Sequence, residues 1–205
     1  MIDLYAAPTT NGLRAKITLD ECGLDYTLHK VNMHDQEQKT PEFLAMNPMG
    51  MTPVIIDQDG PDGKPITMAQ SIAILFYLAE KSGRFLPRDP AARAAFWDPM
   101  MNTATDFGPT YGAIMFISRW SDENPLAKAQ FQQRFREYCR IWDAKLANQR
   151  NCAGEEVTIA DFSLFGIFTR AKSVYAEMAN GFGNLDRWHD EISARPGVQR
   201  GMKFD

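Results

Sequence analysis

The chain has 205 residues, of which 44% are hydrophobic and 23% are charged, and these proportions are typical of a globular protein with a buried core, not of a disordered or fibrous chain. Its 22 Lys and Arg residues against 26 Asp and Glu residues give a net charge of −4, without a dense basic stretch, so nucleic acid is not an expected partner. No apolar run approaches the ~18 residues that span a bilayer, and the first residues lack a signal-peptide pattern, so we expect a cytoplasmic protein with no membrane partner.

The three cysteines are not expected to form disulfides or to bind metal. Cys22, Cys139 and Cys152 are widely spaced and form neither a Cys-x-x-Cys pair nor a zinc pattern. A reactive thiol at Cys22 is an alternative, but a small buried hydrophobic residue is the more common state of such a cysteine. The histidines share no spacing typical of metal ligands, so no metal site is predicted.

The first 80 residues alternate between strand and helix. Residues 2–6 (IDLYA) form a predicted strand, residues 11–23 a helix that ends at a glycine, and residues 25–32 a second strand, which together predict a parallel βαβ unit. The next predicted elements are a short helix at 40–47, a strand at 53–57, a turn rich in Gly, Asp and Pro at 59–65, a strand at 65–68 and a helix at 70–83. This half is therefore expected to be a small α/β domain.

After a connector with two prolines at 82–90, only helical periodicity remains. Apolar residues recur at helical spacing over 91–120, 126–149, 158–174 and 185–197. The sequence thus predicts two domains, an α/β domain at 1–82 and an all-helical domain at 90–205.

A polar turn follows the first predicted strand. Thr9, Thr10 and Asn11 lie where the next helix begins, and the free N–H groups and positive dipole of a helix start favour an anion. Hydroxyl and amide hydrogens can donate to a thiolate, but no cysteine is present here, so the sulfur would belong to a ligand. Helix capping alone also explains these residue types, and on this evidence it is the preferred interpretation.

Two further polar positions flank later strands. Pro53 begins a strand, and if the Thr52–Pro53 bond is cis, the Thr52 backbone groups can pair with an extended, peptide-like ligand. Gln70 and Ser71 begin a helix directly after a strand, where they can hold a carboxylate. An ordinary trans proline and simple capping are the alternatives. In the expected topology all three positions converge on one edge of the sheet.

At this point the chain resembles a known family, the cytosolic glutathione transferases, whose N-terminal domain is thioredoxin-like and whose C-terminal domain is all helical. The resemblance covers nearly the whole chain and is carried by residues 2–12 (IDLYAAPTTNG), 23–32 (GLDYTLHKVN), 41–55 (PEFLAMNPMGMTPVI), 68–80 (MAQSIAILFYLAE) and 157–165 (VTIADFSLF). In the last of these, Thr158 and Asp161 look like the capping box of the family, which has a structural role.

The opening turn is most similar to the bacterial Nu class, in which a threonine and an asparagine lie next to the glutathione sulfur. The resemblance implies these catalytic roles for Thr9 and Asn11, with the strand residue Tyr5 as second choice. It also implies that Thr52, with Pro53, pairs with the cysteinyl backbone of glutathione. Gln70 and Ser71 would then hold the γ-glutamyl group, and Gln38 would lie close to the glycine end.

Two residues depart from the pattern of the Nu class. Met51 stands where those relatives commonly have lysine, and Gln70 stands where they have glutamate. The glycine carboxylate of glutathione would then lack an obvious cation, for which Lys39 can substitute.

The resemblance implies a glutathione transferase that uses glutathione as cosubstrate and activates its thiol for attack on an electrophile or a disulfide. The alternative is a non-catalytic binding or interaction protein that keeps the fold. A homodimer is expected from the family. The acceptor pocket would be lined from the helical domain, with candidates at Met101, Phe107, Tyr111 and Met115. The alternative, which is the more common state of such residues at helical spacing, is that they belong to the core.

Overall fold

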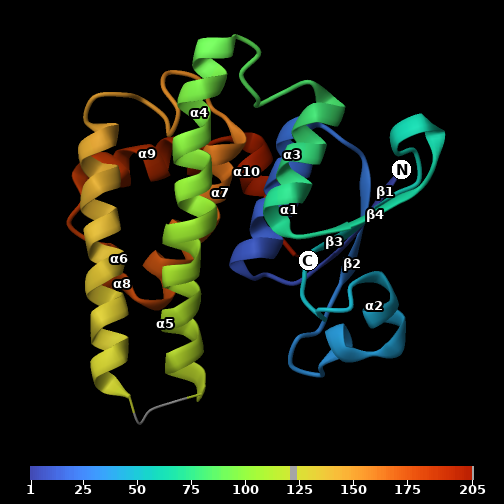
Figure 1. Ribbon diagram of the computed structural model, residues 1–205, viewed down its shortest axis with the longest axis horizontal. Helices are drawn as coiled ribbons and strands as arrows, with labels where there is room; N and C mark the ends of the chain where they lie inside the picture. Colours follow the sequence, from blue (N-terminus) through green and yellow to red (C-terminus); the bar gives the residue numbers. More distant parts are fainter. Residues whose placement is uncertain (121–123, 205) are drawn as a thin grey trace. The chain divides into compact units, whose positions relative to one another are not determined.

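The computed structural model describes residues 1–120 and 124–204, which divide into two compact units (Figure 1). The first unit is Met1–Leu86 together with Ala194–Asp205, and the second is Pro87–Ser193. Residues 121–123 and 205, which the predicted helical domain includes, lie outside the described residues. No helix in the described ranges has both the length and the apolar character that crossing a membrane requires.

The first unit contains a four-stranded sheet and the helices that cover it. The predicted strands and helices are all present, with two short 3-10 turns in addition. In chain order its elements are β1 (Ile2–Ala6), α1 (Thr10–Cys22), β2 (Tyr26–Lys30), η1 (Glu37–Lys39), α2 (Pro41–Met46), β3 (Val54–Asp57), η2 (Pro61–Gly63), β4 (Ile66–Ala69), α3 (Ser71–Ser82) and α10 (Pro196–Gly201).

The strand order in the sheet is β2-β1-β3-β4. Strands β1 and β2 are parallel, as the βαβ prediction requires, and β3 is antiparallel to both β1 and β4. In this register Tyr5 lies opposite Val54, and Val54 lies opposite Ala69. The chain leaving β1, the chain entering β3 and the chain leaving β4 therefore meet at one end of the sheet.

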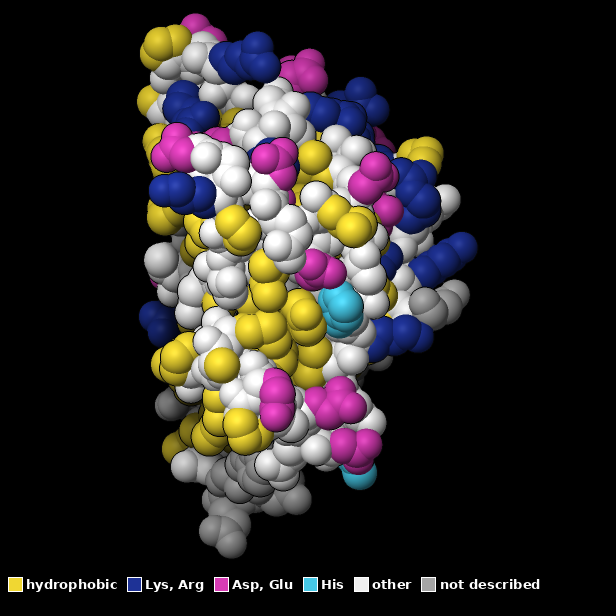
Figure 2. All heavy atoms as spheres, turned by 90° about the vertical axis from the view of Figure 1, so that its right-hand side faces the viewer, with side chains coloured by type: hydrophobic (Ala, Val, Ile, Leu, Met, Phe, Trp, Pro, Cys, Tyr) yellow, Lys and Arg dark blue, Asp and Glu magenta, His cyan; other side chains and the backbone are white. Residues whose placement is uncertain are grey.

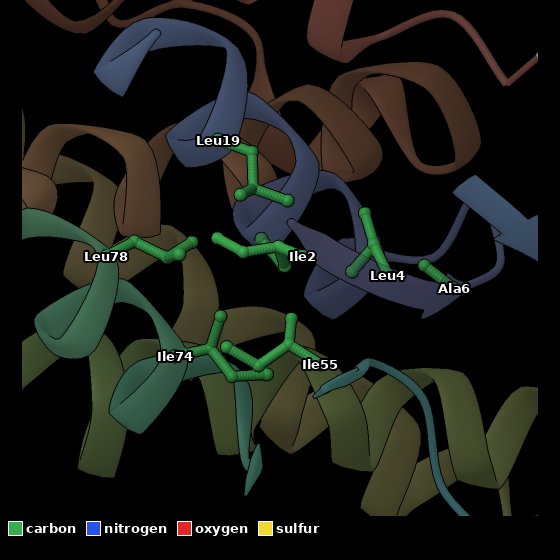
Figure 3. Packing of buried hydrophobic residues seen from close by; sticks show 8 residues of the cluster. Ile2, Leu4, Ala6, Leu19, Ile55, Ile74 and Leu78 are labelled. Carbon is green, nitrogen blue, oxygen red and sulfur yellow. The ribbon is translucent and has the colours of Figure 1, made fainter. Parts of the chain in front are cut away.

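Alternation along β1 separates the two faces of the sheet. Ile2, Leu4 and Ala6 are buried in one cluster with Leu19 of α1, Leu78 of α3 and further residues of β3 and α3 (Figure 3). Burial of such aliphatic side chains stabilises the fold by about 1.5–3 kcal/mol each. This layer anchors α1 and α3 on one face of the sheet, so the first residues of both helices are held in place.

The second face of the sheet is covered by α2. Phe43 of α2 is buried against Val31 and Val54, and Tyr5 packs partly buried beside them. Thr40 caps α2 by accepting the N–H of Phe43 at 3.3 Å, and Pro41 occupies the first helical position, where its missing N–H has no consequence.

The last helix of the chain packs on α1, so the structure differs from the predicted 90–205 domain at its C-terminal end. A Cβ atom on Gly201 would lie 2.6 Å from the Cα atom of Ile17, so only glycine permits this close approach of α10 to α1. Arg195 donates from Nε to the Oε2 atom of Glu21 at 3.1 Å, and Lys16 donates to the Arg200 carbonyl at 2.8 Å. These contacts bind the C-terminal segment to the first unit.

The second unit is helical throughout its described residues. Its elements are α4 (Pro90–Asn102), the π-helical turn η3 (Thr103–Phe107), α5 (Gly108–Trp120), α6 (Pro125–Leu146), α7 (Ile159–Val174), α8 (Ala176–Ala179) and α9 (Gly183–Ser193). The predicted helix at 91–120 is thus divided by η3. The predicted helix at 185–197 ends at Ser193, because Pro196 lacks the N–H that would continue it and instead begins α10.

The predicted capping box is present at the start of α7. The buried carboxylate of Asp161 accepts the N–H of Thr158 at 2.8 Å, the N–H of Cys152 at 2.8 Å and the indole N–H of Trp188 at 2.9 Å. One carboxylate therefore joins the start of α7 to the preceding loop and to α9, which confirms a structural role for this motif.

Candidate functional site

The predicted site residues of three chain segments lie at one end of the sheet. Thr9 follows β1, Thr52 precedes β3 and Ser71 follows β4, and the strand register brings these three segments side by side. The predicted convergence of the segments is therefore a property of the fold.

Thr9 caps α1 and keeps its hydroxyl hydrogen available. Its Oγ1 atom accepts the N–H of Gly12 at 3.1 Å, and its own N–H donates to the Ala7 carbonyl at 2.7 Å. A Cβ atom on Gly12 would lie 2.0 Å from the Ala7 oxygen, so this turn requires glycine there. A hydroxyl that accepts one N–H still has a hydrogen to donate, so capping and donation to a ligand are compatible.

Asn11 has an orientation that a charged neighbour fixes. The Nη1 atom of Arg14 donates to the Oδ1 atom of Asn11 at 2.9 Å. Because a guanidinium only donates, the atom that faces it must be the amide oxygen, and the NH2 group of Asn11 is left to donate elsewhere. The turn therefore presents a hydroxyl and an amide donor beside the positive end of the α1 dipole.

Arg14 also connects this turn to the start of α3. It is only 4% exposed, and the Nη1 atom that binds Asn11 lies 3.5 Å from the Oγ atom of Ser71. Burial lowers the pKa of Arg14 to about 10, so the side chain stays positively charged at neutral pH. Arg14 is not among the residues predicted from the sequence; its position three residues after Asn11, on the same helix face, is the signal that could have identified it.

Thr52 and the loop before it are held by an asparagine. The Thr52–Pro53 bond is cis, and Thr52 is buried, with its hydroxyl 3.9 Å from the sulfur of Met33. Its backbone N–H and C=O have no partner among the residues that the structure describes. Asn47 fixes the loop, since its amide donates to the Met51 carbonyl at 2.7 Å and its oxygen accepts the N–H of Met49 at 3.2 Å.

Gln70 and Ser71 occupy the junction between β4 and α3. Gln70 has a φ angle of 71°, a left-handed conformation that is unfavourable for a residue with a Cβ atom, and its side chain is exposed. Ser71 is buried at the first position of α3, where the first N–H groups of the helix have no intrahelical acceptor. Strain of this kind is concentrated at binding sites.

Gln38 and Lys39 lie in the short turn η1. Gln38 is 7% exposed, and its Oε1 atom has no hydrogen-bond partner among the described residues. Lys39 donates from Nζ to the Met49 carbonyl at 3.3 Å, which places its ammonium beside the loop that leads to Thr52. Met51 is 55% exposed at the position where the sequence analysis noted a missing lysine. A cation is therefore present next to this position, supplied by η1.

Comparisons with known proteins identify the family. The N-terminal and C-terminal domains of glutathione S-transferase match residues 10–81 and 125–191. The disulfide-bond oxidoreductase YfcG of Escherichia coli (strain K12) is 32% identical over 210 residues, which cover 98% of this chain and 94% of that protein. The chain belongs to the glutathione transferase family.

Solved structures share the fold of this glutathione transferase. One from Burkholderia graminis, with two glutathione molecules bound per subunit, has a TM-score of 0.91 and 32% identity and covers 98% of this chain and 87% of that one. One from Pseudomonas putida, with one glutathione disulfide bound per subunit, has a TM-score of 0.89 and 30% identity and covers 99% and 91%. The first unit is thus the thioredoxin-like domain of the family, and the second is its helical domain.

Tyr5 of this glutathione transferase has a packing role. Its ring stacks on His29 with centroids 4.4 Å apart, on the sheet face that α2 covers. His29 in turn contacts the carboxylate of Asp3 at 2.8 Å. The first helix, which carries Asn11, lies on the opposite face. Tyr5 and the Thr9–Asn11 turn are thus separate features of the structure, and the assignment of Thr9 and Asn11 as donors stays a prediction.

The four acceptor-side candidates of the helical domain divide into core and surface residues. Phe107 is fully buried and stacks on Phe135 with centroids 4.5 Å apart, so it belongs to the core. Tyr111 is also buried, but its hydroxyl has no partner among the described residues, and burial raises its pKa to about 12. Met101 is partly exposed, as is Met115. Tyr111 is the candidate that retains an unused polar atom.

The cysteines and histidines do not assemble into a metal site within the described ranges. Cys22, Cys139 and Cys152 are all buried and unbridged, and burial raises the pKa of each thiol. No group of three or more His, Cys, Asp or Glu side chains in residues 1–120 and 124–204 can hold a metal ion. On the face shown in Figure 2 the histidine side chains lie apart, and basic side chains are interspersed with acidic ones.

Proposed function

We propose that this chain is a glutathione-dependent enzyme that ionises the thiol of bound glutathione and directs it at a disulfide or a carbon electrophile. The observation that carries the proposal is that Thr9 and Asn11, at the start of α1, each keep a hydrogen-bond donor that no residue in 1–120 or 124–204 uses. Thr52 and Ser71 lie beside them through the strand register. No thiol of the chain itself is present in this turn.

The proposed chemistry depends on forming a thiolate at neutral pH. A free thiol has a pKa of about 8.5, and each unit by which the site lowers it corresponds to about 1.4 kcal/mol in favour of the anion. A helix N-terminus contributes about 0.3–2 kcal/mol, and a hydrogen bond to a charged group about 1.5–3 kcal/mol. The donors of Thr9 and Asn11, with the buried charge of Arg14 behind them, are therefore sufficient to lower the thiol pKa by one to two units.

The rest of glutathione is assigned to the neighbouring groups. The free backbone N–H and C=O of Thr52, next to Pro53, pair with the cysteinyl residue as an added strand would. Gln70, Ser71 and the first N–H groups of α3 hold the γ-glutamyl end. At the glycine end, Gln38 offers an unpartnered acceptor to an N–H group, and Lys39 supplies the cation that Met51 does not.

Disulfide reduction is the reaction that the relatives favour. The E. coli relative is named a disulfide-bond oxidoreductase, and the two solved relatives hold two glutathiones or glutathione disulfide. The thiolate of one glutathione attacks a disulfide sulfur, forms a mixed disulfide and releases the first thiolate product. A second glutathione then attacks the mixed disulfide, which releases the second thiol and yields glutathione disulfide. The two electrons come from the two glutathione thiols, so no further reductant is needed.

The class of the enzyme, the roles of its two domains, its assembly and its localisation are proposed from the same family resemblance. We place the chain in the Nu class, because Thr9 and Asn11 occupy the turn in which that class carries its threonine and asparagine. We assign glutathione binding to the first unit, which includes the predicted residues 1–82, and the acceptor pocket to the helical unit, with Tyr111 as its polar contact. A cytoplasmic homodimer is proposed, and exposed apolar residues such as Phe116 and Trp97 are available to its interface.

Calorimetry and turnover together test the proposed function. Glutathione should bind saturably, and the protein should reduce a simple dialkyl disulfide with glutathione as the electron donor. Saturable binding without turnover of a disulfide or an aryl halide would support the non-catalytic alternative instead. Absence of binding by both glutathione and its disulfide at tens of millimolar would reject both readings.

A further inference from the structure

The first unit has a pocket that lies away from the proposed glutathione site. It has a volume of about 380 Å³, and its walls include Asp20, Glu21, Arg84, Arg195 and Arg200; we call it the α1–α10 pocket. Its size falls in the range of about 300–1,000 Å³ that is typical of small-molecule sites. Asp20 and Glu21 lie near the C-terminal end of α1, whereas Thr9 caps its other end, so about 18 Å of helix separates these carboxylates from the Thr9 turn.

Both carboxylates of the pocket are already engaged. Glu21 accepts from the Nε atom of Arg195 at 3.1 Å and from the N–H of Val198 at 3.2 Å. Asp20 accepts from the hydroxyl of Tyr26 at 3.0 Å and lies 3.4 Å from both the Lys16 ammonium and the Arg200 Nε atom. Neither carboxylate therefore has a shortage of donors.

Arg84 adds a cation that no carboxylate balances. Among the residues that the structure describes, its guanidinium makes no ion pair; it lies over the ring of Phe85, 4.9 Å from the centroid. The guanidinium of Arg195 lies over the same ring at 5.7 Å. Phe85 holds this position with a left-handed φ of 61°, which is unfavourable for a bulky residue. The ring thus supports two guanidiniums, although their like charges repel each other.

Each of the three arginines has guanidinium N–H groups that donate to none of the described residues. Arg195 uses Nε and Nη2 on Glu21, and Arg200 uses Nε and Nη2 on Asp20, so the Nη1 group of each is unoccupied. The whole fork of Arg84 is unoccupied as well. The pocket walls hold these three arginines against two carboxylates, an excess of one positive charge. Lys16, which pairs with Asp20 from outside the walls, adds a second.

We propose that the α1–α10 pocket binds a small phosphate monoester, with its phosphate group held by Arg84, Arg195 and Arg200. A phosphate monoester carries close to two negative charges above pH 7, which match the excess, and its three terminal oxygens match three arginine donors better than a carboxylate does. The pocket volume leaves room for an organic group beside the phosphate. This site is independent of the proposed glutathione chemistry.

Calorimetry with phenyl phosphate at pH 7.5 and low salt tests the proposal. The wild-type protein should bind it saturably, in the presence of saturating glutathione as well as in its absence. Arg84→Met should weaken binding by about tenfold, because it removes a charge-assisted fork. Lys64→Met, which removes the same charge from an exposed turn of the same unit, should leave the affinity unchanged. Arg84 is exposed and forms no ion pair with the described residues, so its variant should fold normally.

Several outcomes would overturn the proposal. The first three are absence of saturable binding of phenyl phosphate, equal weakening of its binding by Lys64→Met, and its displacement by glutathione. The fourth is inorganic phosphate binding as tightly as phenyl phosphate, since this would mean that only the free ion is recognised. Amide chemical-shift mapping provides a check that needs no variant. Phenyl phosphate should shift resonances in residues 20–24, 83–86 and 194–201, and shifts concentrated elsewhere would reject this pocket.

Discussion

The Nη1 atom of Arg14 donates to the Oδ1 atom of Asn11 at 2.9 Å, and this bond decides which end of the Asn11 amide is free. A fully buried cation beside a turn of hydrogen-bond donors favours an anion there in two ways, through its charge and through the orientation it imposes on Asn11. Arg14 therefore links helix packing to the proposed thiol chemistry.

Replacement of Arg14 tests this link through the pH dependence of the rate. Arg14→Met should raise the thiol pKa of bound glutathione by about one unit, since it removes the buried charge and frees the Asn11 amide. The rate of disulfide reduction should fall near pH 7 and recover as the pH rises through the new pKa. A rate that stays low at every pH, or a parallel loss of folded protein, would assign Arg14 a purely structural role.

The cation proposed for the glycine end of glutathione, Lys39, is tested by moving the positive charge to position 51. Lys39→Met should raise the KM for glutathione about fivefold with little change in kcat, because it removes one exposed ion pair with the ligand. Met51→Lys, introduced into that variant, should restore the KM, since Met51 is exposed on the loop that the Lys39 ammonium contacts. If Lys39→Met leaves the KM for glutathione unchanged, Lys39 does not act at this end of the ligand.

Asp57 makes the stability of the first unit dependent on pH. Burial opposes its ionisation, but the Lys81 ammonium at 2.8 Å and the Tyr77 hydroxyl at 2.6 Å outweigh that effect and hold its pKa below the ordinary value of 3.8. Because the pKa of Asp57 is lower in the folded than in the unfolded state, its ionised form stabilises the fold at pH values above the pKa of the unfolded state. This contribution is lost as the pH falls through the pKa of the folded state.

The free energy of unfolding should follow this sign. Asp57→Asn should cost about 2 kcal/mol at pH 7, and the difference from the wild type should shrink below about pH 4. Urea unfolding measured from pH 3 to pH 7 provides the check. A difference that is constant over this range would mean that the charge of Asp57 does not stabilise the fold.

The carboxylate of Asp161 should be among the most important polar groups for the stability of the helical domain. Asp161→Ala leaves the buried N–H groups of Cys152, Thr158 and Trp188 without their acceptor and should cost about 3 kcal/mol or more. Asp190→Ala, which removes an exposed carboxylate, is the matched control. Similar unfolding midpoints for the two variants would show that the capping box contributes little.

The sequence predicts the meeting of the three site segments because topology alone determines it. Once residues 2–6, 53–57 and 65–68 are strands and the third strand runs antiparallel to the first and the fourth, the ends of β1 and β4 and the start of β3 must lie at the same end of the sheet. The strand alternation in residues 2–6 also identifies which side chains enter the core.

Contacts between segments that are distant in the sequence cannot be predicted from strand order or from local periodicity. Helical periodicity indicates that Phe107 faces inward, but it does not identify Phe135 as its partner. Periodicity alone therefore cannot tell core residues from residues that line a pocket. Nothing in the local pattern indicates that Arg195 returns to Glu21 across 174 residues and binds α10 to the first unit. Nor does periodicity indicate that the charged Arg14 is buried, because tertiary packing decides that.

The most direct test of the central claim is the ultraviolet absorbance of the glutathione thiolate, titrated against pH in the bound state. Thr9→Ala and Asn11→Ala should each raise the thiol pKa by about one to two units, because each removes a donor to the charged form. Thr9→Ser, which keeps the cap and the hydroxyl, should titrate like the wild type, as should Thr10→Ala and Tyr5→Phe. A pKa that moves with Tyr5→Phe and stays in place with Thr9→Ala and Asn11→Ala would contradict the assignment of these two residues as the thiolate donors.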